Sequence, residues 1–190
     1  AKVVLDDGYV APFGFIFIRV SCACILFFAL TWLLGNWEKI QPKDWPHLML
    51  CGLLGVSLNQ LFFFKGLALT LPINASLMMI TTPILVLLVS AMLLGESLTP
   101  QKIMGTLIGV GGCILVILSG GKSFSFGSET VLGDFLVLLN ASFYALYLVT
   151  VKPLMKKYHP LTVIRWVFFF GFFPVLAVGL GEFRAIDWSS

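Results

Sequence analysis

Long runs of apolar residues, separated by short polar segments, dominate this chain. Six runs fall at about residues 12–35, 46–69, 72–95, 101–119, 132–152 and 160–181. A helix rises about 1.5 Å per residue, so roughly 20–24 residues cross a hydrocarbon core about 30 Å thick. The helices of a soluble domain would need a polar face toward water. The pattern therefore predicts an all-α, multi-pass membrane protein.

The composition supports this prediction and narrows the function. Apolar residues make up 59% of the 190 residues and charged residues 11%, whereas soluble domains carry about a quarter charged residues. The net charge of +3 is too small to favour a nucleic-acid partner. All four cysteines lie in apolar runs, which favours packing roles over disulfides or a metal site. We expect no metal and no cofactor.

The distribution of charge predicts the orientation in the membrane. The segments 36–45, 96–100 and 152–159, with the residues that flank them, carry six lysines and three acidic residues. The segments on the opposite side carry three basic and six acidic residues. The positive-inside rule therefore places the three lysine-rich segments in the cytoplasm.

Two stretches of the chain are alike. Pro12 and Arg19 follow a polar segment and lead into a long apolar run, and Pro160 and Arg165 do the same later. Such a repeat would contain five helices, and an odd number inverts the second copy in the membrane. Inverted repeats are typical of secondary transporters, with the substrate site near mid-membrane. We therefore expect a fragment of a protein of about ten helices.

A series of short motifs carries a family resemblance. The motifs run from Ala68-Leu69 through Pro72, Ala75, Pro83, Leu94-Gly95-Glu96, Leu98-Thr99, Gln101, Gly105, Gly109 and Gly112. This stretch resembles the EamA domain of the drug/metabolite transporter superfamily. Gly133-Asp134, Asn140-Ala141, Tyr144-Ala145 and Tyr147 are similar to the start of a second EamA domain. The resemblance implies two inverted five-helix repeats and a carrier for amino acids, other small metabolites or toxic compounds.

The resemblance also implies how the chain is divided. Residues 1–119 would form a first repeat lacking most of its first helix, and 120–131 an extracytoplasmic linker. Residues 132–190 would hold the first two helices of a second repeat. We expect a multi-pass protein of the bacterial cytoplasmic (inner) membrane. Its partners would be a small-molecule substrate, the lipid bilayer, and the missing C-terminal helices or a second chain that completes the site.

Polar side chains inside apolar runs are the candidate substrate ligands. Asn59 and Gln60 lie within 46–69, where an unpaired amide would be costly, so both are expected to face protein or a water-filled cavity. Substrate binding and a purely structural bond between helices are equally compatible with this pair.

A second candidate group surrounds a proline. Asn74, Met78 and Thr81 share one helix face, and Thr81-Thr82 immediately precede Pro83. Proline removes a backbone hydrogen bond and kinks a helix, so Pro83 is a candidate hinge beside hydroxyl ligands. The alternative is that Thr82 or a water merely satisfies the freed carbonyl.

Asn140, Tyr144 and Tyr147 form a third group, because their i, i+4 and i+7 spacing places them on one helix face. Asn140 and Tyr144 are candidate ligands. Tyr147 lies closer to the predicted cytoplasmic end, where an interfacial tyrosine is the alternative.

Basic and small residues in the runs have structural explanations. Lys65, Arg19 and Arg165 are expected to extend their long side chains toward the membrane interface. Five glycines are expected to allow close helix packing. They are Gly52, Gly55, Gly105, Gly109 and Gly112.

The acidic residues complete the functional prediction. Asp134 and Glu96 lie at the ends of runs, where capping or loop roles are expected, and no carboxylate lies deep inside a run. This disfavours proton-coupled export of lipophilic cations and favours a zwitterionic, anionic or neutral metabolite. No Ser–His pair or metal cluster suggests an enzyme. We predict a secondary transporter of a small polar metabolite such as an amino acid. The alternatives are a non-transporting scaffold, a channel-like subunit or an inactive fragment.

Overall fold

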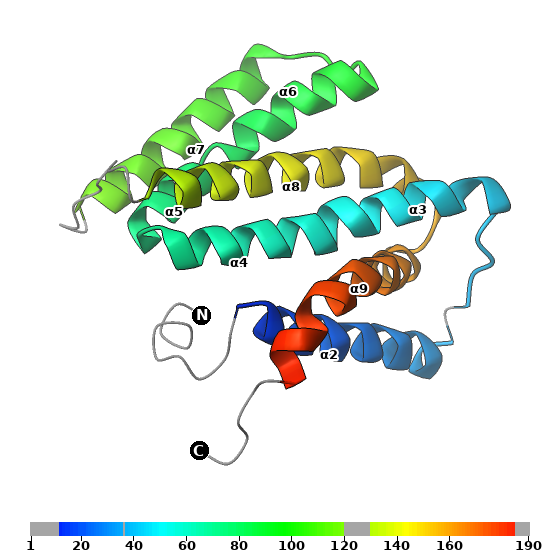
Figure 1. Ribbon diagram of the computed structural model, residues 1–190. Helices are drawn as coiled ribbons and strands as arrows, with labels where there is room; N and C mark the ends of the chain where they lie inside the picture. The colour runs from blue at the N-terminus through cyan, green and yellow to red at the C-terminus, as the bar shows by residue number, and fades with distance from the viewer. Residues whose placement is uncertain (1–11, 36, 120–129, 185–190) are drawn as a thin grey trace.

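The computed structural model describes residues 12–35, 37–119 and 130–184 of the chain, and within these ranges it is helical without strands (Figure 1). In the same ranges, six helical stretches are long and apolar enough to cross a membrane. The first is α2 (Pro12–Leu33), and the last two are α8 (Val131–Lys157) and α9 (Pro160–Arg184). The predicted all-α, multi-pass architecture is confirmed.

The second and third spans are each made of several pieces. A short 3₁₀ turn, η1 (Pro42–Asp44), leads into α3 (Trp45–Gly52), the π-helical turn η2 (Leu53–Leu58) and α4 (Asn59–Leu69). The third span consists of α5 (Pro72–Met79) and α6 (Thr82–Leu94). The fourth span, α7 (Pro100–Ser119), follows a short connection.

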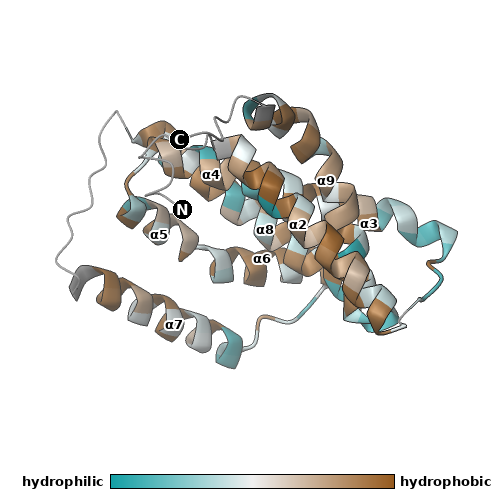
Figure 2. Ribbon diagram, turned by 90° about the horizontal axis from the view of Figure 1, so that it is seen from below, coloured by the Kyte–Doolittle hydropathy of each residue, from teal (hydrophilic) through white to brown (hydrophobic). Residues whose placement is uncertain are grey.

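The continuous α3–η2–α4 span lies at the centre of the molecule (Figure 1). It packs against α9 and α2 on one side and against α8 on the other. The α6 helix packs on the far side of α8, and α7 lies beyond it. Figure 2 shows that α7 stands apart from most of the bundle and is mainly apolar, except at one end.

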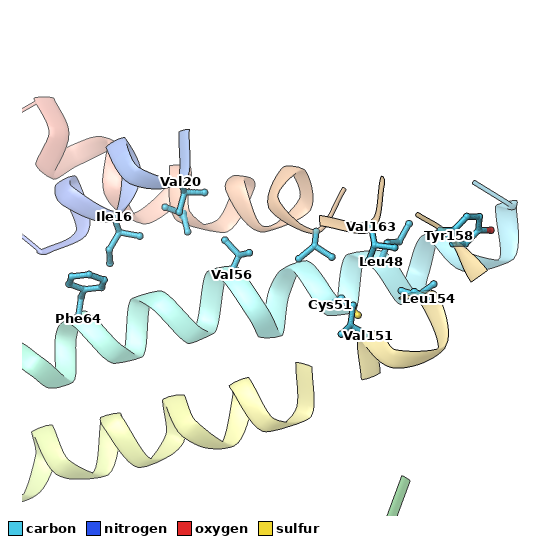
Figure 3. Packing of buried hydrophobic residues seen from close by; sticks show 12 residues of the cluster. Ile16, Val20, Leu48, Cys51, Val56, Phe64, Val151, Leu154, Tyr158 and Val163 are labelled. Atoms are coloured by element: carbon cyan, nitrogen blue, oxygen red, sulfur yellow. The ribbon is translucent and has the colours of Figure 1, made fainter. Parts of the chain in front are cut away.

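The apolar core joins the central span to α2, α8 and α9. Ile16 and Val20 from α2 point toward Val56 and Phe64 of the central span, and Val163 of α9 approaches Leu48 at its other end (Figure 3). Large apolar side chains also cover the outside: Met92 is 82% exposed and Val116 is 71% exposed. Such an outer surface suits lipid rather than water.

The third span is broken where the sequence predicts a kink. Helix α5 ends at Met79 and α6 begins at Thr82, because Pro83 has no N–H to donate to the Met79 carbonyl. The Thr81 hydroxyl donates to the Met78 carbonyl at 2.6 Å, whereas the Thr82 hydroxyl has no partner. Thr82 therefore does not satisfy the freed carbonyl.

One helix boundary differs from the prediction made from sequence, and another agrees with it. The fifth span continues as helix to Lys157 rather than ending near 152, because lysine favours helix and needs only to leave the hydrocarbon. Helix α6 ends at Leu94, close to the predicted limit of about 95. The next residue, Gly95, has φ +63°, a backbone conformation that would strain most other residues.

Candidate functional site

A groove of about 1000 Å³ runs between the broken third span, α7 and α8. We call it the α6–α7–α8 groove. One end carries charged side chains and the middle is apolar. The other end carries hydroxyl groups. Its lining includes Thr82, Pro83, Val86, Leu87 and Ser90 of α6, Gly105, Gly109 and Val110 of α7, Tyr144, Leu148 and Lys152 of α8, and Glu96.

The charged end is an ion-pair network. The Lys152 ammonium donates to the Glu96 carboxylate and to the Ser90 hydroxyl, both at 2.9 Å. Lys102 contacts the other Glu96 oxygen at 3.3 Å. Hydrogen bonds from Lys152 first, and then from Ser90, lower the pKa of Glu96 to about 2. Glu96 is therefore a stable anion at the mouth of the groove.

The apolar middle exposes the backbone of α7. Apart from the neighbouring backbone of α7 itself, no described atom lies within 4 Å of the position that a Cβ would take at Gly105 or Gly109. Gly112 is equally open. In the described part of the chain no second helix lies close to these three glycines, so their role in close helix packing stays a prediction. Gly105 and Gly109 widen the groove.

The other two glycines of this prediction, Gly52 and Gly55, have the opposite environment. A Cβ at Gly52 would lie 2.7 Å from the Val167 carbonyl oxygen, and one at Gly55 would lie 2.5 Å from the Tyr147 ring. Helix α3 and the π-helical turn therefore approach α9 and α8 at van der Waals distance. Tyr147 is partly buried here and packs against the central span.

The hydroxyl end brings together part of the predicted ligand set. Thr82 is 8% exposed with a hydroxyl that has no partner, and Tyr144 comes from α8 across the groove. Tyr144 stacks on Tyr147 with 6.1 Å between ring centroids. Pro83 lines the groove between them, so Thr82, Pro83 and Tyr144 share one site.

The predicted amide ligands lie elsewhere, between α4 and α8. Asn140 is 1% exposed and donates from Nδ2 to the backbone carbonyl of Asn59 at 2.7 Å. Neither Asn140, Asn59 nor Gln60 lines the groove. The Asn140 amide thus forms a hydrogen bond that joins α8 to the central span.

Asn74 belongs to a separate buried cluster around a carboxylate. Asp134 is 7% exposed and accepts from the Thr70 hydroxyl at 2.5 Å and the Asn74 amide at 3.2 Å. Gly133 allows this contact, because a Cβ there would lie 2.6 Å from the Leu69 carbonyl carbon. The prediction that Asp134 has a capping or loop role is wrong. Its carboxylate instead forms hydrogen bonds that connect α8 to the α4–α5 hairpin. The feature of the sequence that could have indicated this contact is Gly133, directly before Asp134, because a glycine allows another backbone to approach closely.

The three basic residues of the runs fall into two groups. Arg19 and Lys65 are exposed, with their charged ends 6.0 Å and 5.8 Å from the ring centroids of Phe64 and Phe13. Arg165, in contrast, is only 1% exposed. The prediction that it extends to the interface is wrong, because aromatic side chains from α2 and the following segment cover it.

The six membrane-length helical stretches of the described residues indicate an integral multi-pass membrane protein. Residues 2–118 match the EamA-like transporter family, and the chain belongs to that family. This confirms the family that the sequence motifs predicted. The family is one of transporters and not of enzymes.

Named relatives support this assignment. An uncharacterized transporter of Archaeoglobus fulgidus is 30% identical over 160 residues, covering 84% of this chain and 54% of the relative. The aromatic amino acid exporter YddG of Ancylobacter novellus is 31% identical, covering 77% and 51%. A probable terminal-alkyne amino-acid exporter of Streptantibioticus cattleyicolor is 27% identical, covering 87% and 53%.

A solved crystal structure has the same fold, with a TM-score of 0.72 at 24% identity, covering 96% of this chain and 61% of that one. The chain spans a little over half the length of the curated relatives that it matches. The division into repeats at 1–119 and 132–190 stays a prediction, and most of the linker 120–131 lies outside the described residues.

Proposed function

We propose that this protein is a secondary transporter that exports or exchanges a small zwitterionic metabolite of the amino-acid type. The observation that carries the proposal is the α6–α7–α8 groove, which combines an ion pair at one end with an apolar wall. A zwitterion offers one group to each partner of that pair. Two relatives named as amino-acid exporters support the same substrate class.

The groove suits such a ligand at each point along its length. The ligand's carboxylate would take the place of Glu96 on Lys152, and its ammonium group would bind Glu96. Its side chain would lie along Val86 and Leu148 and over the open backbone of α7 at Gly109. Because the ligand supplies both charges, neither partner of the ion pair is left uncompensated.

The charges of the groove also weigh against lipophilic cations as substrates. A carboxylate that is free to take a cation is the usual means of binding one within the bilayer. Glu96, the carboxylate that lines this groove, is held by Lys152 and Lys102. Cation export coupled to proton exchange by the complete protein would contradict the proposal.

The broken third span supports an alternating-access mechanism. Helix α6 lines the groove and is joined to α5 through the two-residue break before Pro83, so a change at the break would move one wall. Discontinuous helices at the substrate site and inverted repeats recur among secondary transporters. The archaeal and bacterial relatives support a location in the cytoplasmic membrane.

The proposal is tested by flux through proteoliposomes. The protein encoded by the complete reading frame that contains this chain is reconstituted, and the loss of a preloaded amino-acid mixture is followed by mass spectrometry. We expect saturable efflux of particular amino acids. Lys152→Gln should abolish it, whereas Lys156→Gln, which removes an exposed lysine one turn further along α8, should not.

Two results would contradict the proposal. Flux that rises linearly with concentration would indicate a channel-like subunit. No flux from a folded protein, for any amino acid, would favour a non-transporting scaffold.

A further inference from the structure

Arg165 is buried in a box of aromatic rings. It lies in the second turn of α9 and is 1% exposed. Its guanidinium carbon is 4.8 Å from the ring centroid of Trp37, 5.2 Å from that of Trp166 and 5.5 Å from that of Phe28. We call this arrangement the Arg165 box. The rings come from α2, the segment after it and α9.

Two of the guanidinium nitrogens in the box have no hydrogen-bond acceptor among the described residues. Aromatic faces attract a cation, but the N–H groups of a guanidinium lie in its plane and need acceptors. The Nε and Nη1 atoms of Arg165 are buried, and no residue that the structure describes accepts a hydrogen bond from them. The same holds for the Thr162 hydroxyl and the Trp166 indole N–H, which belong to the same stretch of α9.

No acidic side chain of the described residues forms an ion pair with Arg165. Glu38 acts on its charge electrostatically, yet the Glu38 carboxylate accepts the His159 backbone N–H at 2.8 Å. Glu38 is therefore engaged by the residue that directly precedes α9. A buried charge without a close partner is costly, so an arginine kept in this position indicates a missing acceptor.

The surroundings favour an anion as that acceptor. Lys39, Lys43, Lys156 and Lys157 lie in the two segments that meet at this end of the bundle. Of the two acids there, Glu38 is engaged as described and Asp44 accepts hydrogen bonds from Lys157 and Tyr158. The local excess of positive charge raises the concentration of anions near the box.

We propose that the Arg165 box is a binding site for a phosphate group, either of a membrane lipid or of a free phosphate ion. A guanidinium forms paired, charge-assisted hydrogen bonds to phosphate oxygens, which an aromatic ring cannot supply. Arg165 lies five residues after Pro160, about 7.5 Å along the helix, within reach of lipid headgroups. Trp37, 58% exposed, covers the box from outside and is the residue that an entering anion displaces.

This site does not depend on the proposed transport function, because it lies on α9 and α2, away from the α6–α7–α8 groove. Its position at the end that charge predicts to be cytoplasmic places it beside the leaflet with anionic lipids. Occupancy would join α2 to α9 through the ligand.

The experiment measures binding to the delipidated full-length protein in detergent. The probes are radiolabelled inorganic phosphate, short-chain phosphatidylglycerol and, as a reference, short-chain phosphatidylcholine. We expect Arg165→Lys, which keeps the charge but loses the planar fork, to bind the preferred probe about tenfold more weakly, and Arg165→Gln to bind it up to about a hundredfold more weakly. Arg19→Gln removes an exposed arginine that also lies over an aromatic ring, and it should bind as the wild type does.

The probes separate the two sources of phosphate. Binding of inorganic phosphate that competes with phosphatidylglycerol indicates a free-anion site, and binding of phosphatidylglycerol alone indicates a lipid site. If Arg165→Gln does not fold, the binding affinity of Arg165→Lys alone tests the proposal. Equal binding by wild type, Arg165→Lys and Arg19→Gln, or no binding above the phosphatidylcholine reference, would overturn the proposal.

Discussion

Glycines on the two sides of this molecule have opposite environments. On the α3–α9 side, Gly52 and Gly171 bring two backbones together, with 2.7 Å between a Cβ position at Gly52 and the Val167 carbonyl oxygen. On the α7 side, Gly105 and Gly109 face the groove, and no described residue from another helix lies within 4 Å of their Cβ positions. The same residue type in an apolar helix thus serves packing in one place and space in another. What decides is the helix that lies opposite.

The largest expected effect is on the packed side. Gly52→Val should destabilise the protein by about 3 kcal/mol or more, because the added carbons collide with backbone of α9, which cannot rotate away as a side chain can. The measurement is the free energy of unfolding in mixed micelles. Gly105→Ala is the matched control and should be neutral or slightly stabilising, since alanine favours helix by about 0.5–1 kcal/mol. Equal losses in both variants would remove the distinction between the two sides.

The buried carboxylate gives the next effect. Asp134→Ala removes the acceptor of the Thr70 and Asn74 hydrogen bonds and should cost about 2–3 kcal/mol of unfolding free energy. Ser142→Ala, in the same helix, removes only a bond to the Leu138 carbonyl one turn away and should change little. Unfolding of both variants, measured side by side, would show whether Asp134 joins α8 to the α4–α5 hairpin. A loss no larger than that of Ser142→Ala would contradict that role.

On the open side, added bulk should affect transport and not folding. Gly109→Leu places a side chain where the substrate would lie, so saturable efflux should fall by about tenfold or more. Thermal unfolding should stay near that of the wild type, because the position is open. Unchanged efflux in a folded Gly109→Leu protein would place the substrate elsewhere.

The smallest effect concerns pH at the mouth of the groove. The pKa of Glu96 falls from an ordinary 4.5 to about 2, so the folded state favours the ionised form. The stabilisation is complete above pH 4.5 and is lost as the pH falls from there toward 2. The wild type should therefore lose stability over this range relative to Glu96→Gln. A constant difference between the two proteins, measured by unfolding from pH 6 down to pH 2.5, would contradict the ion-pair network.

The fold could be predicted in most of its elements. The six spans follow from run length, the break at Pro83 from proline chemistry, and the start of α7 from Thr99, whose hydroxyl accepts the Lys102 N–H at 3.4 Å. Each of these features depends on residues close together in the sequence. For the same reason, Thr82, Pro83 and Tyr144 were reasonable candidates, being polar or proline residues inside apolar helices.

The sequence by itself determined the membrane class, the family, most of the helix limits and the excess of lysine at one end. It did so because bilayer thickness, helix geometry and backbone chemistry act over a few turns of chain. Only the tertiary structure decided which glycines face a groove, that Asp134 meets Thr70 across 64 residues, and that Arg165 lies beneath Trp37. Burial is a property of neighbours, and those neighbours come from distant parts of the chain.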